Sequence, residues 1–258
     1  MKTTVFSHFL KVDNVGDLFS CPLDYFKIED SERINFLDLN LSKNHEATLP
    51  NLIFGGGGML HDVFVDIFER FTKHPNRRKL IFWGAGINEH DLDKQYFPTF
   101  LNNFDLVGLR DYNNPWNYIP CPSCMSPVFD SIKSPITDFV TYAHYDNNIC
   151  IQTPFNKNNR LVLGESLLDI INFLSQGETI ITNSYHGAYW GMLLRRKVLI
   201  YKPFSNRFYG FKYQPPFCDE KNWDVSIGIS PPTDYLIECR SLNEEFSKKI
   251  TKILNRAP

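Results

Sequence analysis

Short apolar runs that end in glycine-rich or polar turns recur along the chain, and most of them lead into segments with helical spacing. The clearest runs are NLIF (51–54), KLIFW (79–83) and TIIT (179–182). Short buried strands that alternate with helices are typical of a parallel sheet with crossover helices. The sequence therefore predicts an α/β fold.

The order of these units predicts two α/β halves. Further strands are expected at 3–6, 104–111, 138–145, 148–154 and 198–201, and helices at 59–73, 166–176, 185–197 and 241–254. Gly177 is the expected C-cap of the second helix, and Ser241 with Glu244 the capping box of the last. A Pro-, Ser-, Asn- and Cys-rich stretch at 112–137 is expected to join the halves, giving domains 1–136 and 137–258. In such folds ligands bind beyond the carboxyl ends of the strands, near helix N-termini.

Composition excludes several classes of protein. The chain is 43% hydrophobic and 22% charged with a formal net charge of -2, which fits a globular protein and gives no indication of a nucleic-acid partner. Neither a signal peptide nor an apolar stretch of about 20 residues is recognisable, so we expect a cytoplasmic protein. Among the six cysteines only Cys121 and Cys124 have suggestive spacing. One such pair is a weak zinc signal, and we expect reduced thiols, no metal and no cofactor.

Two glycine-rich loops follow predicted strands. The first, FGGGGML, contains Gly56 and Gly57, and the second is WGAGI. Neither matches a dinucleotide-binding fingerprint or a P-loop. The glycines either let the backbone approach a ligand at an anion-favouring helix N-terminus or permit tight packing of strand on helix.

The segment 179–218 contains six lysines and arginines but no aspartate or glutamate. This imbalance indicates that the second half faces an anion. Lys202, Arg207 and Lys212 follow a predicted strand and are the expected ligands. Arg195 and Arg196 fall in a last helical turn, where cations are usually solvated.

His186 lies in the first turn of a predicted helix, with Asn183 or Ser184 as the N-cap. The positive end of a helix lowers the pKa of a histidine, whereas a bound anion raises it, so His186 is a candidate general acid. His144 and Arg110 stand at strand ends and are further candidates. The remaining histidines have no comparable context: His8, His45, His61, His74 and His90.

Taken in order, the motifs NVGD, FGGGGML, FWGAGI, VGLRD, PCPSCM, YAHY and TNSYHG with GMLLRRKVLIY resemble the polysaccharide pyruvyl transferase family over about residues 12–213. The resemblance implies two Rossmann-like halves around a cleft, similar to GT-B glycosyltransferases. It also implies transfer of the carbon unit of phosphoenolpyruvate onto two hydroxyls of a sugar. The product is a cyclic pyruvate ketal in cell-surface polysaccharide, and no metal is required.

Carried onto this chain, the resemblance makes His186 the acid that protonates the donor methylene. Arg110 would bind the carboxylate or phosphate, with Lys202 or Arg207 helping. The resemblance places Asn14 and Asp17 at the border of the cleft.

Other functions stay open, because Tyr185 precedes His186 where many family members carry an arginine shortly before the histidine. One alternative is a GT-B glycosyltransferase with a nucleotide-sugar donor. Another is a non-catalytic sugar-binding or assembly protein. The expected partners are one of these donors and a sugar or lipid-linked oligosaccharide acceptor, with peripheral membrane association also open.

Overall fold

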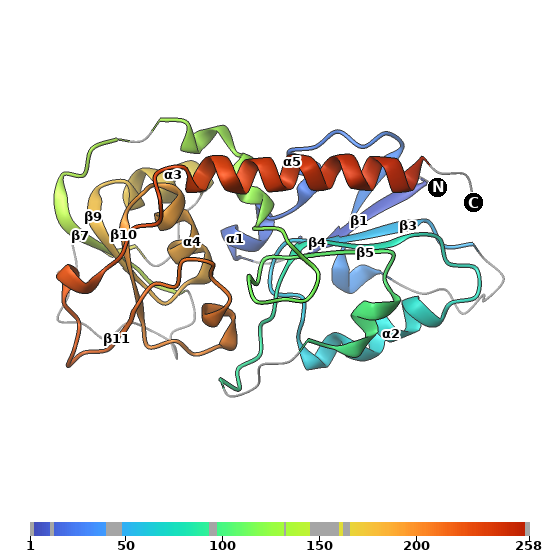
Figure 1. Ribbon diagram of the computed structural model, residues 1–258, viewed down its shortest axis with the longest axis horizontal. Helices are drawn as coiled ribbons and strands as arrows, with labels where there is room; N and C mark the ends of the chain where they lie inside the picture. The colour runs from blue at the N-terminus through green and yellow to red at the C-terminus, as the bar shows by residue number, and fades with distance from the viewer. Residues whose placement is uncertain are drawn as a thin grey trace. The chain divides into compact units, whose positions relative to one another are not determined.

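The computed structural model describes residues 3–10, 13–39, 48–92, 97–131, 133–144, 160–161 and 166–255. The chain divides into two compact units. The first unit consists of Met1–Glu89, Asp93–Met125 and Cys239–Pro258, and the second of His90–Leu92 and Ser126–Glu238. The sequence instead predicted one boundary at 136 and left the C-terminal helix in the second half. Both units are coloured along the chain in Figure 1.

The first unit is built on a six-stranded parallel sheet in the order β2-β1-β3-β4-β5-β6. Its strands are β1 (Thr4–His8), β2 (Ser31–Asn35), β3 (Asn51–Gly55), β4 (Leu80–Ala85), β5 (Leu106–Leu109) and β6 (Asn117–Tyr118). The order reverses direction between β1 and β3. Ligands of open α/β sheets bind beyond the carboxyl ends of the strands at such a switch point.

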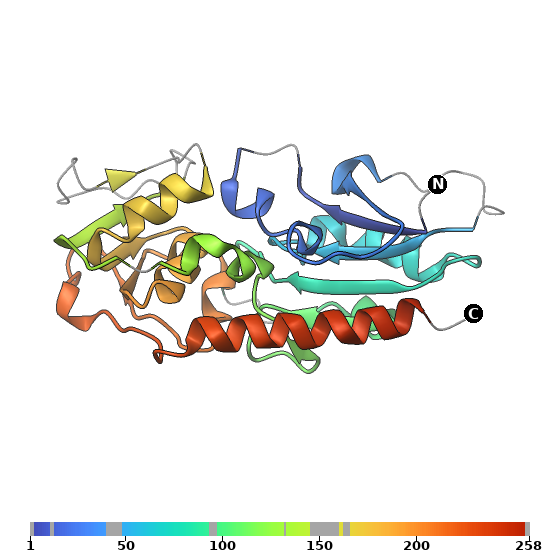
Figure 2. The same cartoon turned by 90° about the horizontal axis from the view of Figure 1, so that it is seen from above.

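Helices cover both faces of this sheet. On one side lies α2 (Val65–Lys73), and on the other lies α5 (Tyr235–Leu254), drawn in red (Figures 1 and 2). Phe68 of α2 is buried and stacks on Phe100 with ring centroids 5.1 Å apart. Phe246 and Ile250 of α5 are buried against β1, β3 and β4. Truncating a buried phenylalanine such as Phe68 to alanine costs about 3–5 kcal/mol, so both layers are integral to the unit.

The second unit contains a five-stranded parallel sheet in the order β11-β10-β9-β7-β8. Its strands are β7 (Thr137–Tyr142), β8 (Arg160–Leu161), β9 (Gly177–Thr182), β10 (Lys197–Tyr201) and β11 (Phe217–Cys218). Numbered from the first strand of the unit, this is the same 2-1-3-4-5 order as in the first sheet, with the switch point between β7 and β9. The predicted α/β class and its two parallel sheets are confirmed.

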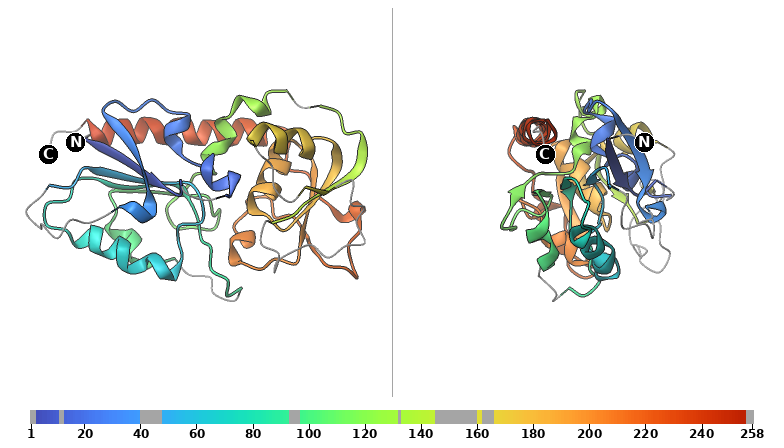
Figure 3. Two further views of the ribbon diagram at one scale, coloured as in Figure 1. Left: turned by 180° about the vertical axis from the view of Figure 1, so that it is seen from behind. Right: turned by 90° about the vertical axis from the view of Figure 1, so that its right-hand side faces the viewer.

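The described residues contain three further helices: α1 (Val15–Leu18), α3 (Leu167–Leu174) and α4 (Tyr185–Leu193). The yellow and orange helices of the second unit lie beside its strands in Figure 3. Short 3-10 turns lie at η1 (Pro22–Asp24), η2 (Phe36–Asp38), η3 (Asp62–Phe64), η4 (Thr99–Asn103), η5 (Pro122–Met125), η6 (Pro127–Phe129), η9 (Asn206–Tyr209) and η10 (Val225–Ile227).

Several predicted helix ends are wrong. The last helix begins at Tyr235, so Ser241 lies inside it and the predicted capping box does not form. Gly177 opens β9 and is no C-cap. Val63, placed on the buried face of the predicted helix 59–73, is 67% exposed, because η3 precedes α2 and changes the helical phase. The predicted strand at 148–154 lies outside the described residues.

Helix α4 differs in character from its prediction. The sequence predicted a helix over 185–197, but α4 ends at Leu193 and all nine of its residues are buried. A helix that is buried on every side needs small residues where it meets the sheet. Gly191 is one of them, since a Cβ there would lie 2.7 Å from Ile180 Cδ1.

Candidate functional site

Asn14, Asp17, Gly56 and Gly57 of the first unit follow β1 and β3, the two strands at the switch point of its sheet. The NVGD segment forms a short turn in which Asn14 Oδ1 accepts from Gly16 N (3.0 Å) and Asn14 Nδ2 donates to Asp17 Oδ2 (3.0 Å). These bonds fix Asp17 against the glycine loop that follows β3. A Cβ on Gly57 would lie 2.9 Å from Asp17 Oδ1. Asn14, Asp17 and Gly57 are therefore brought together, and their contact with a ligand stays a prediction.

The first glycine loop needs its glycines for both conformation and space. Gly56 and Gly57 have φ of 72° and 71°, a left-handed conformation that side chains other than glycine rarely adopt. A Cβ on Gly56 would lie 2.2 Å from Ser20 O. Tight packing of this loop is thus observed. Contact of the loop with a ligand stays a prediction.

The two glycine loops are joined by backbone hydrogen bonds. Gly86 N donates to Gly57 O (3.1 Å), and Leu60 N donates to Gly86 O (3.0 Å). Gly86 has no room for a side chain, because a Cβ would lie 2.5 Å from Arg110 Nε and 2.7 Å from Asp111 Oδ2. The loops after β3, β4 and β5 therefore form one continuous carboxyl edge.

Arg110 and Asp111 end β5 and are both buried, at 2% and 4% exposed. Asp111 Oδ2 accepts from Ile87 N (3.0 Å), which fastens the second glycine loop to β5. Burial raises the pKa of Asp111 to about 6, and the nearby Arg110 guanidinium partly opposes this shift. Asp111 can therefore exchange a proton near neutral pH. The sequence reasoning singled out Arg110 and missed Asp111, although an acidic residue directly after a strand end was a usable signal.

The candidates of the second unit also gather at a switch point. Asn183 Oδ1, beyond β9, accepts from His144 N, beyond β7, at 2.7 Å. Ser184 is the N-cap of α4, where its Oγ accepts from Gly187 N (3.3 Å). Asn183, Ser184 and His144 therefore lie together, and of the two predicted caps Ser184 is the one observed.

His186 is in the first turn of α4 and is 5% exposed. Its ring lies 5.4 Å from that of Tyr185 and 5.2 Å from that of Trp190, measured between centroids. Gly187 allows this turn to reach the sheet, because a Cβ there would lie 2.5 Å from both Thr182 Oγ1 and Tyr142 Cδ1. His186 is thus held by packing at a helix N-terminus, where the field of the helix favours an anion.

Arg207 lies among aromatic rings in the loop after β10. It is 9% exposed, and its guanidinium carbon lies 4.8 Å from the ring centroid of Phe204 and 5.2 Å from that of Phe208. The rings of His144 and His90 also approach Phe204, at 5.2 Å and 6.0 Å. One arginine and two histidines therefore surround Phe204. The sequence reasoning missed Phe204 and His90, and no local sequence pattern relates them.

The expected excess of free cations in 179–218 is largely compensated. Lys202 Nζ lies 2.6 Å from Glu220 Oε2, and Lys212 forms an ion pair with Glu238. Both acids lie outside the segment counted, Glu220 close to its end and Glu238 in α5. The Glu220 hydrogen bond raises the pKa of Lys202. Of the expected anion ligands, Arg207 is the one that the structure buries.

Arg196 corrects another expectation. It was expected to be solvated at a helix end, but it is 7% exposed and donates to Lys133 O and to Ser175 O. Arg195 is exposed and has φ of 59°. The left-handed residue at the end of α4 is therefore an arginine rather than the usual glycine.

The CPSC motif has a structural role in the first unit. Cys121 and Cys124 are fully buried, and Asn243 of α5 donates to Pro120 O (3.1 Å) and contacts Cys124 Sγ (3.5 Å). Trp83 Nε1 in turn donates to Asn243 Oδ1 (2.9 Å). Across the described ranges, no group of three or more His, Cys, Asp or Glu side chains could hold a metal ion.

No helix in the described part of the chain combines the length and apolar character required to cross a bilayer.

A family model matches part of the chain. Residues 14–113 match the family model described as polysaccharide pyruvyl transferase. A search of curated proteins gave no match. Among solved structures, an uncharacterized protein from Klebsiella pneumoniae subsp. pneumoniae NTUH-K2044 is similar with a TM-score of 0.48 and 18% identity, over 84% of this chain and 92% of that chain. The wall teichoic acid polymerase TagF is similar with a TM-score of 0.40 and 10% identity, over 98% of this chain and 83% of that chain.

Proposed function

We propose, from the polysaccharide pyruvyl transferase domain that residues 14–113 carry, that the protein is a ketal pyruvyltransferase of cell-surface polysaccharide biosynthesis. The family match is the observation that carries the proposal. Its residues include the two bonded glycine loops with Asn14, Asp17, Arg110 and Asp111. The donor is phosphoenolpyruvate, the acceptor is a sugar or a lipid-linked oligosaccharide, and the reaction takes place in the cytoplasm.

In the proposed reaction His186 is the general acid. Its imidazolium gives a proton to the methylene carbon of phosphoenolpyruvate, which leaves an oxocarbenium-like carbon beside the carboxylate. Two sugar hydroxyl oxygens bond to this carbon as the bond to the phosphate oxygen breaks. One hydroxyl proton returns to His186, and the other leaves with the phosphate.

Fixed cations would stabilise the donor and the departing phosphate. Arg207 supports this role because its packing against Phe204 and Phe208 holds the guanidinium in place before any ligand arrives. Arg110 is proposed as a further ligand of the carboxylate or phosphate. Lys202 contributes less, since Glu220 already engages it.

The experiment offers the purified protein phosphoenolpyruvate together with sugar acceptors and measures phosphate release and the ketal product by mass spectrometry. His186→Ala should lower turnover by about 10²–10⁴-fold, the usual contribution of a general acid. Arg207→Ala should lower it by about 10²-fold, and Arg207→Lys should restore little, because lysine lacks the planar stacking group.

Lys202→Ala is the matched control, since it removes a cation that is already paired and exposed. It should change turnover by less than about fivefold. If nucleotide sugars release nucleotide while phosphoenolpyruvate yields nothing, the protein is a glycosyltransferase. Full turnover by His186→Ala would remove this residue from the mechanism.

A further inference from the structure

A pocket opens at the amino ends of the strands of the first unit, away from the glycine loops. Asn51 begins β3, Lys79 directly precedes β4 and Asp105 directly precedes β5. The pocket has a volume of about 550 Å³, within the ~300–1,000 Å³ of small-molecule sites. Its lining residues are Asn51, His74, Pro75, Arg77, Arg78, Lys79, Asp105, Ile253 and Leu254.

The charged side chains of this pocket are mainly cationic. Arg77, Arg78 and Lys79 are consecutive, and Asp105 is the one carboxylate in the lining. Three positive charges against one negative charge leave two positive charges when His74 is neutral. An excess of fixed cations in a concave site concentrates anions there.

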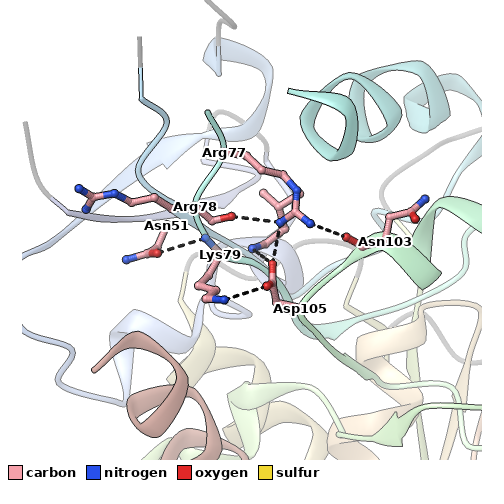
Figure 4. Close-up of polar contacts among 7 residues, drawn as sticks. Asn51, Arg77, Arg78, Lys79, Asn103 and Asp105 are labelled. Carbon is pink, nitrogen blue, oxygen red and sulfur yellow. Dashed lines mark hydrogen bonds and ion pairs between the residues drawn. The ribbon is translucent and has the colours of Figure 1, made fainter. Parts of the chain in front are cut away.

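Asp105 orders two of the three cations (Figure 4). Its Oδ2 accepts from Arg77 Nη1 (2.8 Å) and Leu80 N (3.0 Å), and its Oδ1 accepts from Lys79 Nζ (3.1 Å). Burial opposes ionisation of Asp105, but these hydrogen bonds outweigh it and lower the pKa below its ordinary value. The carboxylate therefore stays charged and fixes the side chains, while it can neutralise only one positive charge.

The hydrogen-bonding capacity of the cations is not exhausted by this network. Lys79 Nζ gives one of its three donors to Asp105. The Arg78 side chain is exposed and extends away from Asp105 in Figure 4. Among the residues that the structure describes, its guanidinium forms no hydrogen bond or ion pair. Arg78 is therefore available as a forked donor to an oxyanion.

We propose that this pocket binds a phosphate group, with Arg78 and Lys79 as its ligands and with Ile253 and Leu254 beside the organic part of the molecule. Phosphate matches the planar fork of arginine and the point charge of lysine. The group could belong to a soluble phosphorylated compound or to a lipid headgroup. The pocket is separate from the proposed catalytic residues and does not depend on the proposed reaction.

The test is calorimetric titration of the full chain with inorganic pyrophosphate at low and at moderate salt. Binding should weaken as salt screens the exposed cations. Arg78→Ala should weaken binding by about fivefold, the upper range for an exposed charge, and Arg78→Glu should weaken it further. The control is Arg195→Asn, which removes an exposed arginine of the second unit and keeps a residue that tolerates positive φ.

One further measurement separates a lipid source from a soluble one. Sedimentation with phosphatidylglycerol vesicles, compared with phosphatidylcholine vesicles, identifies a lipid source if binding depends on Arg78. Pyrophosphate binding that depends on Arg78 without vesicle binding identifies a soluble ligand. If Arg78→Ala binds pyrophosphate as tightly as the wild type, or if Arg207→Ala alone abolishes all binding, the proposal is overturned.

Discussion

Replacing Asp111 by asparagine should change how the stability of the protein depends on pH. Burial raises the pKa of Asp111 to about 6 from the ordinary value of 3.8, with Arg110 opposing the shift. Between these two values the folded protein keeps a proton that the unfolded chain has lost. The stability contributed by this group is therefore fully present below pH 3.8, falls as pH rises, and levels off above pH 6.

The magnitude follows from the gap between the two pKa values, which is about 2.2 units. At 1.36 kcal/mol per unit, the wild type should lose about 3 kcal/mol of unfolding free energy across this range. The asparagine side chain has nearly the same volume as that of aspartate and can still accept from Ile87 N through its amide oxygen. The difference between variant and wild type should therefore isolate the ionisation.

The assay is urea denaturation from about pH 4 to about pH 7.5, with amide exchange in β4 and β5 identifying the transition of the first unit. The variant should gain stability relative to the wild type as pH rises. Asp224→Asn is the control, because hydrogen bonds from Ser226 lower the pKa of this exposed residue below 3.8, so the wild-type-minus-variant difference should stay nearly constant over this pH range. A wild-type-minus-variant difference that is constant within about 0.5 kcal/mol across the range would refute the reasoning.

Three other substitutions test the same unit. His8 is fully buried, and burial lowers its pKa to about 4 from 6.5. In urea denaturation, the unfolding free energy of the wild type should therefore rise by about 3 kcal/mol relative to His8→Leu between about pH 4 and about pH 6.5. Gly86→Ala forces a Cβ to within 2.5 Å of Arg110 Nε and should cost about 1–3 kcal/mol in thermal unfolding; an unchanged melting temperature would contradict the contact. Asn243→Leu leaves Trp83 Nε1 buried without its acceptor and should cost about 2–3 kcal/mol in urea, whereas a loss below about 0.5 kcal/mol would mean that a substitute partner is found.

The inner strands of both sheets were predictable because their sequence signal is local, whereas the edge strands β2, β6, β8 and β11 were not predicted. β3, β4 and β9 are apolar runs followed directly by glycine or polar residues, and each was expected within one or two residues of where it lies. Parallel pairing then places all their carboxyl ends on one edge of each sheet. Asn14, Arg110, His144 and Asn183 could therefore be placed beyond the carboxyl ends of strands without knowledge of the strand order.

The ion pairs and the cluster around Phe204 were not predicted, because they depend on contacts between residues that are distant in the sequence. The pairing of Lys202 with Glu220 and of Lys212 with Glu238 lies across turns that no local count of charges includes. His90 approaches Phe204 although more than one hundred residues separate them in the chain.

The start of α5 also escaped prediction. A capping box at Ser241 is a strong local signal, yet the helix extends back to Tyr235. Tyr235 is 2% exposed, and Cys239 and Asn243 further along are fully buried. Burial of this early face stabilises helical backbone before Ser241, and such tertiary packing overrides local propensity.

The first unit cannot complete its fold during synthesis on the ribosome until helix α5 has been made. Its residues from Cys239 onward cover the sheet face formed by Phe6, Ile53, Ile81 and Trp83, yet the ribosome makes them only after the whole second unit. At about 5–20 residues per second, the intervening segment keeps this apolar face uncovered for several seconds or longer. A nascent chain that stalls between the two segments would present a chaperone-binding surface, and a cell short of chaperones should lose this protein to aggregation before others whose sheets close in sequence order.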